Sequence, residues 1–188
     1  HGFYELGFVI GGKAIHHTRQ YTAQLSAGHV FIIAPGQVHG FTVPEYFEVI
    51  NLYYIAEWVV GDLLGLWEQD GLVSLFFGAT LCPASMPTSI PQYALGKDAT
   101  ARCESEIKDL LREIEREQPS RVYLKSSLLK LITLLYRGYE MSIGPGPSFH
   151  PAVRKVMEKI EVLIRQRTPF SAKEIAVSLG MSTDYLSR

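Results

Sequence analysis

The sequence predicts an α+β fold with three parts: a β-barrel at residues 1–56, a helical region at 57–143 and a smaller helical module at 150–188. Three observations indicate this. Up to about residue 55, short apolar runs alternate with turn residues, which is typical of the strands of a sandwich or barrel. From about residue 57, apolar residues recur at helical spacing. The stretch SIGPGPSFH, with two Pro, two Gly and two Ser, has the composition of a linker.

Charge is unevenly distributed along the 188 residues, whose net charge is −1. Residues 20–96 contain six acidic residues and no Lys or Arg, which excludes this span as a phosphate-binding surface. Residues 150–188 carry seven Lys or Arg and four Asp or Glu, a local net charge of +3. A basic end on an otherwise acidic chain is typical of a protein with a separate nucleic-acid-binding module.

Strands are expected in several stretches of the first part. FYELGFVIGG is rich in aromatic and β-branched residues, and its last two residues, Gly11 and Gly12, predict the end of a strand. AIHHTRQYTAQLSAGHVFIIAPGQVHGF alternates apolar runs with turn residues, and FEVINLYYI predicts a further strand. His16 and His17 are adjacent, so only one of them can face the inside of a barrel.

Helices are expected in the middle part, at 57–69, 98–117 and 120–141, with the Pro-rich stretch PASMPTSIPQ as a loop. Asp98 and Ser120 are the expected N-caps of the second and third helices. These two helices are expected to form an antiparallel hairpin. Their apolar faces either pack on the β-barrel or in part form a dimer contact, and the pattern leaves both alternatives open.

The C-terminal module has the pattern of a helix-turn-helix. Pro151 is expected at the start of its first helix, and Ser171 with Glu174 three residues later predicts a capping box at the next helix. Ala176 is the small residue needed where two helices cross, and Gly180 supplies the positive φ of the turn.

The segment FSAKEIAVSLGMSTDYLSR, preceded by AVRKVMEKIEVLIRQRT, resembles the start of the DNA-binding domain of AraC-type transcription regulators. In that family the domain holds two helix-turn-helix units, and this chain is expected to contain only the first, incomplete one. The resemblance implies that DNA is read by the second helix, where Arg188 suits bidentate hydrogen bonds to guanine. Ser182 and Thr183 suit a phosphate oxygen at the helix N-terminus, and Ser187 lies near the same face.

The N-terminal stretches HGFYELGFVIGG and AGHVFIIAPGQVHGF resemble the two half-motifs of cupins, small β-barrels whose mouth holds a ligand or a metal. Taken literally, this match gives a metal site from His1, Glu5 and His39. In AraC-type regulators the same barrel usually binds a small organic effector, commonly a sugar, without a metal. The resemblance therefore implies an effector site with no metal and no cofactor.

Inward-facing strand residues are expected to line that effector site. Glu5 and His39 are the first candidates for its polar contacts, and Tyr53 and Trp58 can stack against a sugar face. Further candidates for effector binding are Tyr21 and Arg19.

The resulting hypothesis is a cytoplasmic, homodimeric transcription regulator that binds DNA in response to a small molecule and is not an enzyme. The alternative is a metal-dependent cupin enzyme with an accessory helical domain. Cys82 and Cys103 are expected to be reduced thiols of a cytosolic protein. No apolar run is long enough to cross a bilayer, no secretory signal is expected at the start, and the first residue, His, indicates a trimmed N-terminus.

Overall fold

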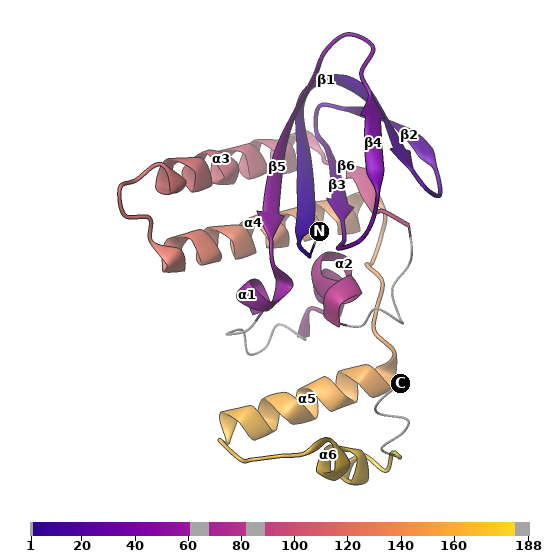
Figure 1. The fold of residues 1–188 in the computed structure, drawn as a ribbon, viewed down its shortest axis with the longest axis vertical. Helices are drawn as coiled ribbons and strands as arrows, with labels where there is room; N and C mark the ends of the chain where they lie inside the picture. Colours follow the sequence, from indigo (N-terminus) through magenta and orange to yellow (C-terminus); the bar gives the residue numbers. More distant parts are fainter. Residues whose placement is uncertain (1, 61–67, 82–88, 183–188) are drawn as a thin grey trace.

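The computed structural model describes residues 2–60, 68–81 and 89–182, and its α+β architecture confirms the expected fold class (Figure 1). An antiparallel sheet of six strands is curled into a half-barrel, and helices pack against it and below it. The strands are β1 (Tyr4–Thr18), β2 (Thr22–Ser26), β3 (His29–Ile33), β4 (His39–Thr42), β5 (Phe47–Tyr54) and β6 (Gln92–Ala94). The helices are α1 (Ala56–Val60), α2 (Asp70–Leu81), α3 (Lys97–Ile114), α4 (Arg121–Ser142), α5 (Pro151–Arg165) and α6 (Ala172–Ser178).

Strand β1 organises the sheet. Its first half pairs with β3 and β5, and its second half pairs with β2 and β4. The expectation that Gly11 and Gly12 end a strand is wrong, because β1 continues through both residues. Gly12 has φ of 72°, and a Cβ there would overlap the backbone of Tyr46, so only glycine fits at the bend. The bent strand curls the sheet into a half-barrel.

A register shift between Val9 and Gly11 of β1 changes which residues face the inside of the curl. Side chains alternate between the two faces of a strand, and one extra residue in a bulge reverses that alternation. Odd-numbered residues such as Glu5 therefore face the inside before the bulge, and even-numbered residues such as His16 face it afterwards. We call this side of the sheet the inner face.

The opposite, outer face of the sheet packs against α2, α3 and α4 in the main hydrophobic core. Helix α2, which the sequence analysis did not predict, has eight buried residues among its twelve, including Leu72 and Phe76. A helix that is apolar on nearly all sides lacks the periodic pattern by which surface helices are found. Within the part of the chain that is described, no helix is long and apolar enough to cross a membrane.

The expected helical hairpin is present as α3 and α4, which lie antiparallel (Figure 1). Ser120 caps α4 as expected, because its Oγ accepts a hydrogen bond of 3.2 Å from the Tyr123 N–H. The expected N-cap of α3 is wrong, since Gly96 takes that position and Asp98 lies in the first turn. An Asp in the first turn still complements the helix dipole, which explains the sequence signal.

Strand β6 lies just after the Pro-rich stretch, where a loop was expected to extend through residue 92. It pairs with β3, and the Tyr93 hydroxyl donates a hydrogen bond of 3.0 Å to the Leu135 carbonyl of α4. The sheet and the helical hairpin therefore share one core across the expected boundary at residue 56. The division into three domains stays a prediction.

The linker before α5 is anchored in the main core by Phe149, which is buried. Its backbone N–H donates a hydrogen bond of 2.9 Å to Asp70 Oδ1 at the start of α2, and Asp70 also pairs with Arg154 of α5. Pro151 begins α5, as expected. The capping box of α6 is also confirmed, with Ser171 N 2.7 Å from Glu174 Oε2.

Replacing Gly7 with Ala is expected to destabilise the fold, because a Cβ at Gly7 would overlap the Phe31 ring. Phe31 is fully buried, so overpacking here should cost about 1–3 kcal/mol in the free energy of unfolding. Urea denaturation followed by circular dichroism measures the loss. Gly40→Ala is the matched control, because Gly40 also lies in a strand and has no atom within 4 Å of an added Cβ. Equal losses in the two variants would contradict the packing explanation.

Candidate functional site

Four polar side chains lie in a row across the inner face, each in contact with the next. Glu5 Oε2 lies 3.5 Å from His39 Nε2, and His39 Nδ1 lies 3.1 Å from His16 Nε2. His16 Nδ1 then lies 3.0 Å from Gln92 Oε1. We call Glu5, His39, His16 and Gln92 the polar row. It links β1, β4 and β6, so these strands hold one another in place through side chains as well as backbone.

Gln92, the last member of the polar row, determines which nitrogen of each histidine donates a hydrogen bond. Gln92 Oε1 can only accept, so His16 donates from Nδ1 and accepts at Nε2 from His39 Nδ1–H. His39 Nε2 then faces a Glu5 oxygen at 3.5 Å. Burial lowers the pKa of His16 from its ordinary value of 6.5, which favours the neutral ring that this order needs.

Aromatic rings surround His16, the fully buried member of the polar row. The His16 ring centroid lies 5.0 Å from that of Phe41 and 5.1 Å from that of Phe31. The Tyr21 ring lies edge-on to His16 at 6.5 Å. Phe31 belongs to a second apolar cluster on this face, which Phe41 packs against. In such surroundings an unpaired polar group is costly, which makes each polar atom without a partner informative.

One such atom is the side-chain oxygen of Asn51 on β5. Asn51 Oδ1 is buried and accepts no hydrogen bond from any of the described residues, while its Nδ2 donates to the Tyr53 hydroxyl at 3.4 Å. Asn51 lies opposite Gly7 and Tyr53 lies opposite Glu5, and residues directly opposite in an antiparallel pair share a face. The inner face therefore carries an unmet acceptor beside the carboxylate end of the polar row.

The structure brings together some of the residues expected to bind an effector. Glu5 and His39 are adjacent in the polar row, and the exposed Tyr53 lies on the same face. Tyr21 also borders this face, but its hydroxyl donates a hydrogen bond of 2.7 Å to the Ile90 carbonyl. Glu5, His39 and Tyr53 therefore lie on the same face of the sheet.

Two of the expected effector residues lie elsewhere. Arg19 is exposed in the turn after β1. Trp58 lies on α1, where Lys125 of α4 approaches its ring at 5.9 Å from the centroid. Neither side chain is placed in the polar row or against its surrounding rings.

Sequence reasoning missed two residues of this face, Asn51 and Gln92. It predicts that one of His16 and His17 faces inward but does not distinguish them, because the bulge that decides between them leaves no clear local signal. Asn51 was visible as an amide among the apolar residues of β5. Gln92 could not be found locally, because its strand exists only through pairing with β3.

Of the residues expected to contact DNA, only Ser182 is among the described residues. Thr183, Ser187 and Arg188 lie outside them. Gly180 has φ of 67°, as a helix-turn-helix turn requires.

The metal interpretation receives no support from the described side chains. Among residues 2–60, 68–81 and 89–182, no group of three or more His, Cys, Asp or Glu is arranged to hold a metal ion. Glu5, His39 and His16 bond to one another in sequence instead of converging on one point. His1, which the cupin match requires, lies outside the described residues.

Comparison with protein families decides the assignment. Residues 1–132 match the model of the AraC-like ligand binding domain. The chain belongs to this family. The AraC-like domain thus includes the whole curled sheet, α2, α3 and the first half of α4. No protein of curated function matches the sequence.

Solved structures of AraC-like regulators resemble the chain at low identity. The AraC-like transcriptional activator CuxR is 10% identical with a TM-score of 0.47, over 97% of this chain and 58% of that one. ToxT K231A from Vibrio cholerae is 14% identical with a TM-score of 0.46, over 98% of this chain and 64% of that one. The chain therefore spans about three-fifths of the length of these two proteins.

Lowering the pH is expected to destabilise the AraC-like domain through His16. Below pH 6.5 the unfolded chain binds a proton at His16 that the buried, neutral ring of the folded protein does not bind. Stability should therefore fall with pH below 6.5, by up to about 1.4 kcal/mol per pH unit. In urea titrations between pH 8 and pH 5, about three pH units, the free energy of unfolding should fall less in His16→Gln than in the natural sequence.

The matched control is His17→Gln, which changes the exposed neighbouring histidine on the same strand. This variant should keep the pH dependence of the natural sequence. A His16→Gln protein with an unchanged pH dependence would show that His16 does not carry the effect.

Proposed function

We propose that the AraC-like domain binds a small polyhydroxylated effector, such as a sugar, on the inner face of its sheet. The observation that carries the proposal is the buried Asn51 Oδ1, which has no hydrogen-bond partner within residues 2–60, 68–81 and 89–182. A buried acceptor without a donor costs about 1–3 kcal/mol, which a ligand hydroxyl would recover. The neighbouring Glu5 carboxylate supplies further acceptors for hydroxyl groups.

A sugar also fits the apolar part of this surface. Tyr53 is 58% exposed, and its ring packs edge-on against Phe3 at 5.2 Å. An exposed aromatic ring held by a neighbour offers a flat apolar surface at low entropic cost. The C–H face of a sugar can cover that ring while its hydroxyls reach Asn51 and Glu5.

The proposed signal passes through the sheet to α2. Tyr4 and Tyr54 are each next in sequence to an inner-face residue, so they point to the outer face, where their rings stack at 5.3 Å. The Tyr4 hydroxyl accepts a hydrogen bond of 2.9 Å from the Thr80 N–H. The Tyr54 hydroxyl donates one of 2.9 Å to the Phe76 carbonyl. A ligand that shifts β1 against β5 would therefore displace Tyr4 and Tyr54, and with them the two hydrogen bonds to α2.

From α2 the connection continues to the C-terminal helices through Asp70, which holds the Phe149 N–H and the Arg154 guanidinium. An effector that prefers one arrangement of sheet and α2 would thus bias the position of α5. Regulation requires only that the effector bind the two arrangements with different affinity.

We further propose that residues 150–188 are the beginning of a DNA-binding module and that the whole protein is a transcription regulator. The capping box of α6, the positive φ of Gly180 and the basic charge of this segment support the proposal. A homodimer is part of the same proposal. Leu111, Ile114 and Tyr123 remain exposed on the hairpin of α3 and α4 and offer an apolar contact for a second copy.

Asn51→Leu tests the effector site directly. Removing a buried acceptor that has no partner should leave the free energy of unfolding unchanged or raise it by about 1 kcal/mol. The same change should abolish the rise in melting temperature that a matching sugar gives to the natural sequence. At 100 times its Kd a ligand contributes about 2.7 kcal/mol of stability, well within the range of a thermal-shift screen of pentoses, hexoses and sugar acids.

Thr42→Ala is the control for that screen, because Thr42 contacts His17 on the exposed side of the sheet. It should keep the ligand response of the natural sequence. A sugar that stabilises Asn51→Leu as much as the natural sequence would contradict the proposed site. A stoichiometric transition metal with substrate turnover would favour the cupin enzyme instead.

Asp70→Asn is expected to loosen the linker from the AraC-like domain. The variant weakens a charge-assisted hydrogen bond to Phe149, which is worth about 2 kcal/mol, and removes the ion pair to Arg154. Limited proteolysis should then cut residues 143–150 faster than in the natural sequence. Glu161→Gln, which removes an exposed ion pair within α5, should leave the cleavage rate unchanged. Equal cleavage rates in Asp70→Asn and the natural sequence would show that Asp70 does not connect α2 to the C-terminal helices.

A further inference from the structure

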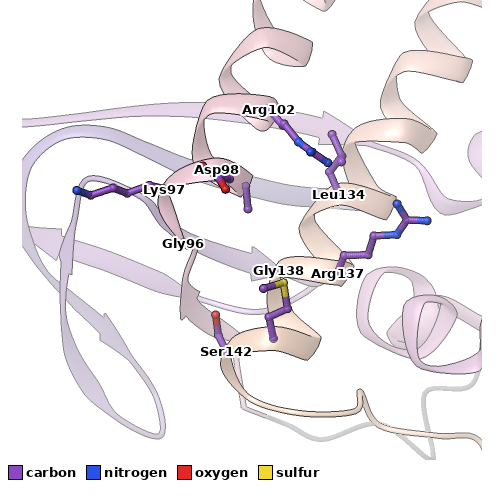
Figure 2. Close-up of a pocket in the computed structure, with 10 residues that line it drawn as sticks. Gly96, Lys97, Asp98, Arg102, Leu134, Arg137, Gly138 and Ser142 are labelled. Carbon is purple, nitrogen blue, oxygen red and sulfur yellow. The ribbon is translucent and has the colours of Figure 1, made fainter.

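A second surface, remote from the inner face, lies where the start of α3 meets the end of α4. It is a groove of about 560 Å³, a volume typical of sites for small molecules. We call it the hairpin groove. Its lining includes Lys97, Asp98, Arg102, Leu134, Arg137 and Met141 (Figure 2). Because α3 and α4 pack on the outer face of the sheet, the hairpin groove and the inner face are on opposite sides of it.

Positive charge gathers in the hairpin groove without a matching set of carboxylates. Figure 2 shows Arg102 extending from α3 toward α4 beside Leu134, with Arg137 extending from α4 on the same side. Neither guanidinium forms an ion pair with a carboxylate in the part of the chain that the structure describes. Asp98 is the acidic residue of the lining, so two cations from neighbouring helices remain available for an anion.

Some other cations of these two helices form ion pairs. Lys130 of α4 pairs with Glu106 of α3, and Arg112 pairs with Asp109 on α3 at 3.0 Å. Among the described residues, no such ion pair engages Arg102 or Arg137. Two guanidinium groups that line one groove from different helices provide the planar, bidentate donors that suit a carboxylate or phosphate.

The floor between these cations is apolar. Leu134 lines it, and Met141, 88% exposed, lies at its rim. Gly138 also lines the groove, and a Cβ there would overlap the Leu95 side chain. A flexible, exposed Met beside a leucine can adapt to ligands of varied shape. The hairpin groove therefore offers an apolar surface next to a pair of cations.

We propose that the hairpin groove is a second ligand site, which binds a small organic anion. Its carboxylate or phosphate contacts Arg102 and Arg137, and its apolar body covers Leu134 and Met141. The start of α3 adds positive potential, because Gly96 provides no side-chain cap for the first amides of the helix. This site is independent of the proposed effector site on the inner face.

Isothermal titration with octanoate and with octyl phosphate tests the proposal on the whole chain, with octanol as the neutral probe. We expect saturable binding of at least one of the two anions at one site per chain, and much weaker binding of octanol. Binding of octanoate alone would identify a carboxylate ligand, and binding of octyl phosphate alone a phosphate ligand. Octanol bound as tightly as both anions would overturn the proposal.

Variants assign the binding to the hairpin groove. Arg102→Ala with Arg137→Ala should weaken anion binding by about tenfold or more, because both charged donors are lost. Asp98→Asn should instead strengthen it, since the variant removes the acidic charge of the lining. Arg121→Ala removes an exposed cation at the opposite end of α4 and should leave the affinity unchanged.

Two further variants separate the site from folding and from the effector site. If the double Ala variant does not fold, Arg102→Gln with Arg137→Gln keeps polar side chains of similar size and should show the same loss. Asn51→Leu should bind the anion as the natural sequence does. Unchanged affinity in the variants without both arginines, or an equal loss in Arg121→Ala, would overturn the proposal, as would loss of binding in Asn51→Leu.

Discussion

The bulge in β1 between Val9 and Gly11 is the constraint on which the rest of the inner face depends. Without it, Glu5 and His16 would point to opposite faces of the sheet, because their positions differ by an odd number. With it, both side chains join the polar row, although they lie in halves of β1 that pair with different strands. Gly12 then turns the strand where no other residue would fit, so one short segment sets both the curl and its lining.

The inner face buries polar side chains at positions where apolar side chains would pack without the free-energy cost of removing polar groups from water. His16 is fully buried, yet it bonds on both sides to polar neighbours instead of being replaced by an apolar residue. Asn51 leaves an acceptor unmet beside that row. Buried polar groups that are conformationally fixed but incompletely satisfied are typical of surfaces prepared for a ligand. On the outer face, the hydroxyls of Tyr54 and Tyr93 both donate to backbone carbonyls.

Sequence reasoning predicted what local chemistry determines. The α+β class, the Ser120 cap, the capping box at Ser171 and the start of α5 each depend on a few neighbouring residues, and the structure confirms them. The features that it missed depend on distant partners. Gln92 becomes part of a strand only by pairing with β3, and α2 is hidden by its own complete burial. The side of the sheet that His16 faces depends on register, which periodicity over a short window does not show.

Strand β6 also imposes an order on synthesis and folding. Strands β1 to β5 are made first and pair locally, but the edge of β3 receives its partner only when residues 92–94 have left the ribosome. Tyr93 then needs Leu135 of α4 for its hydroxyl, so closure waits for the hairpin as well. During this interval β3, with four buried apolar residues, presents an unpaired edge of the kind that recruits other chains. The nascent chain is therefore most vulnerable to aggregation after its sheet has begun to form and before its helices can cover it.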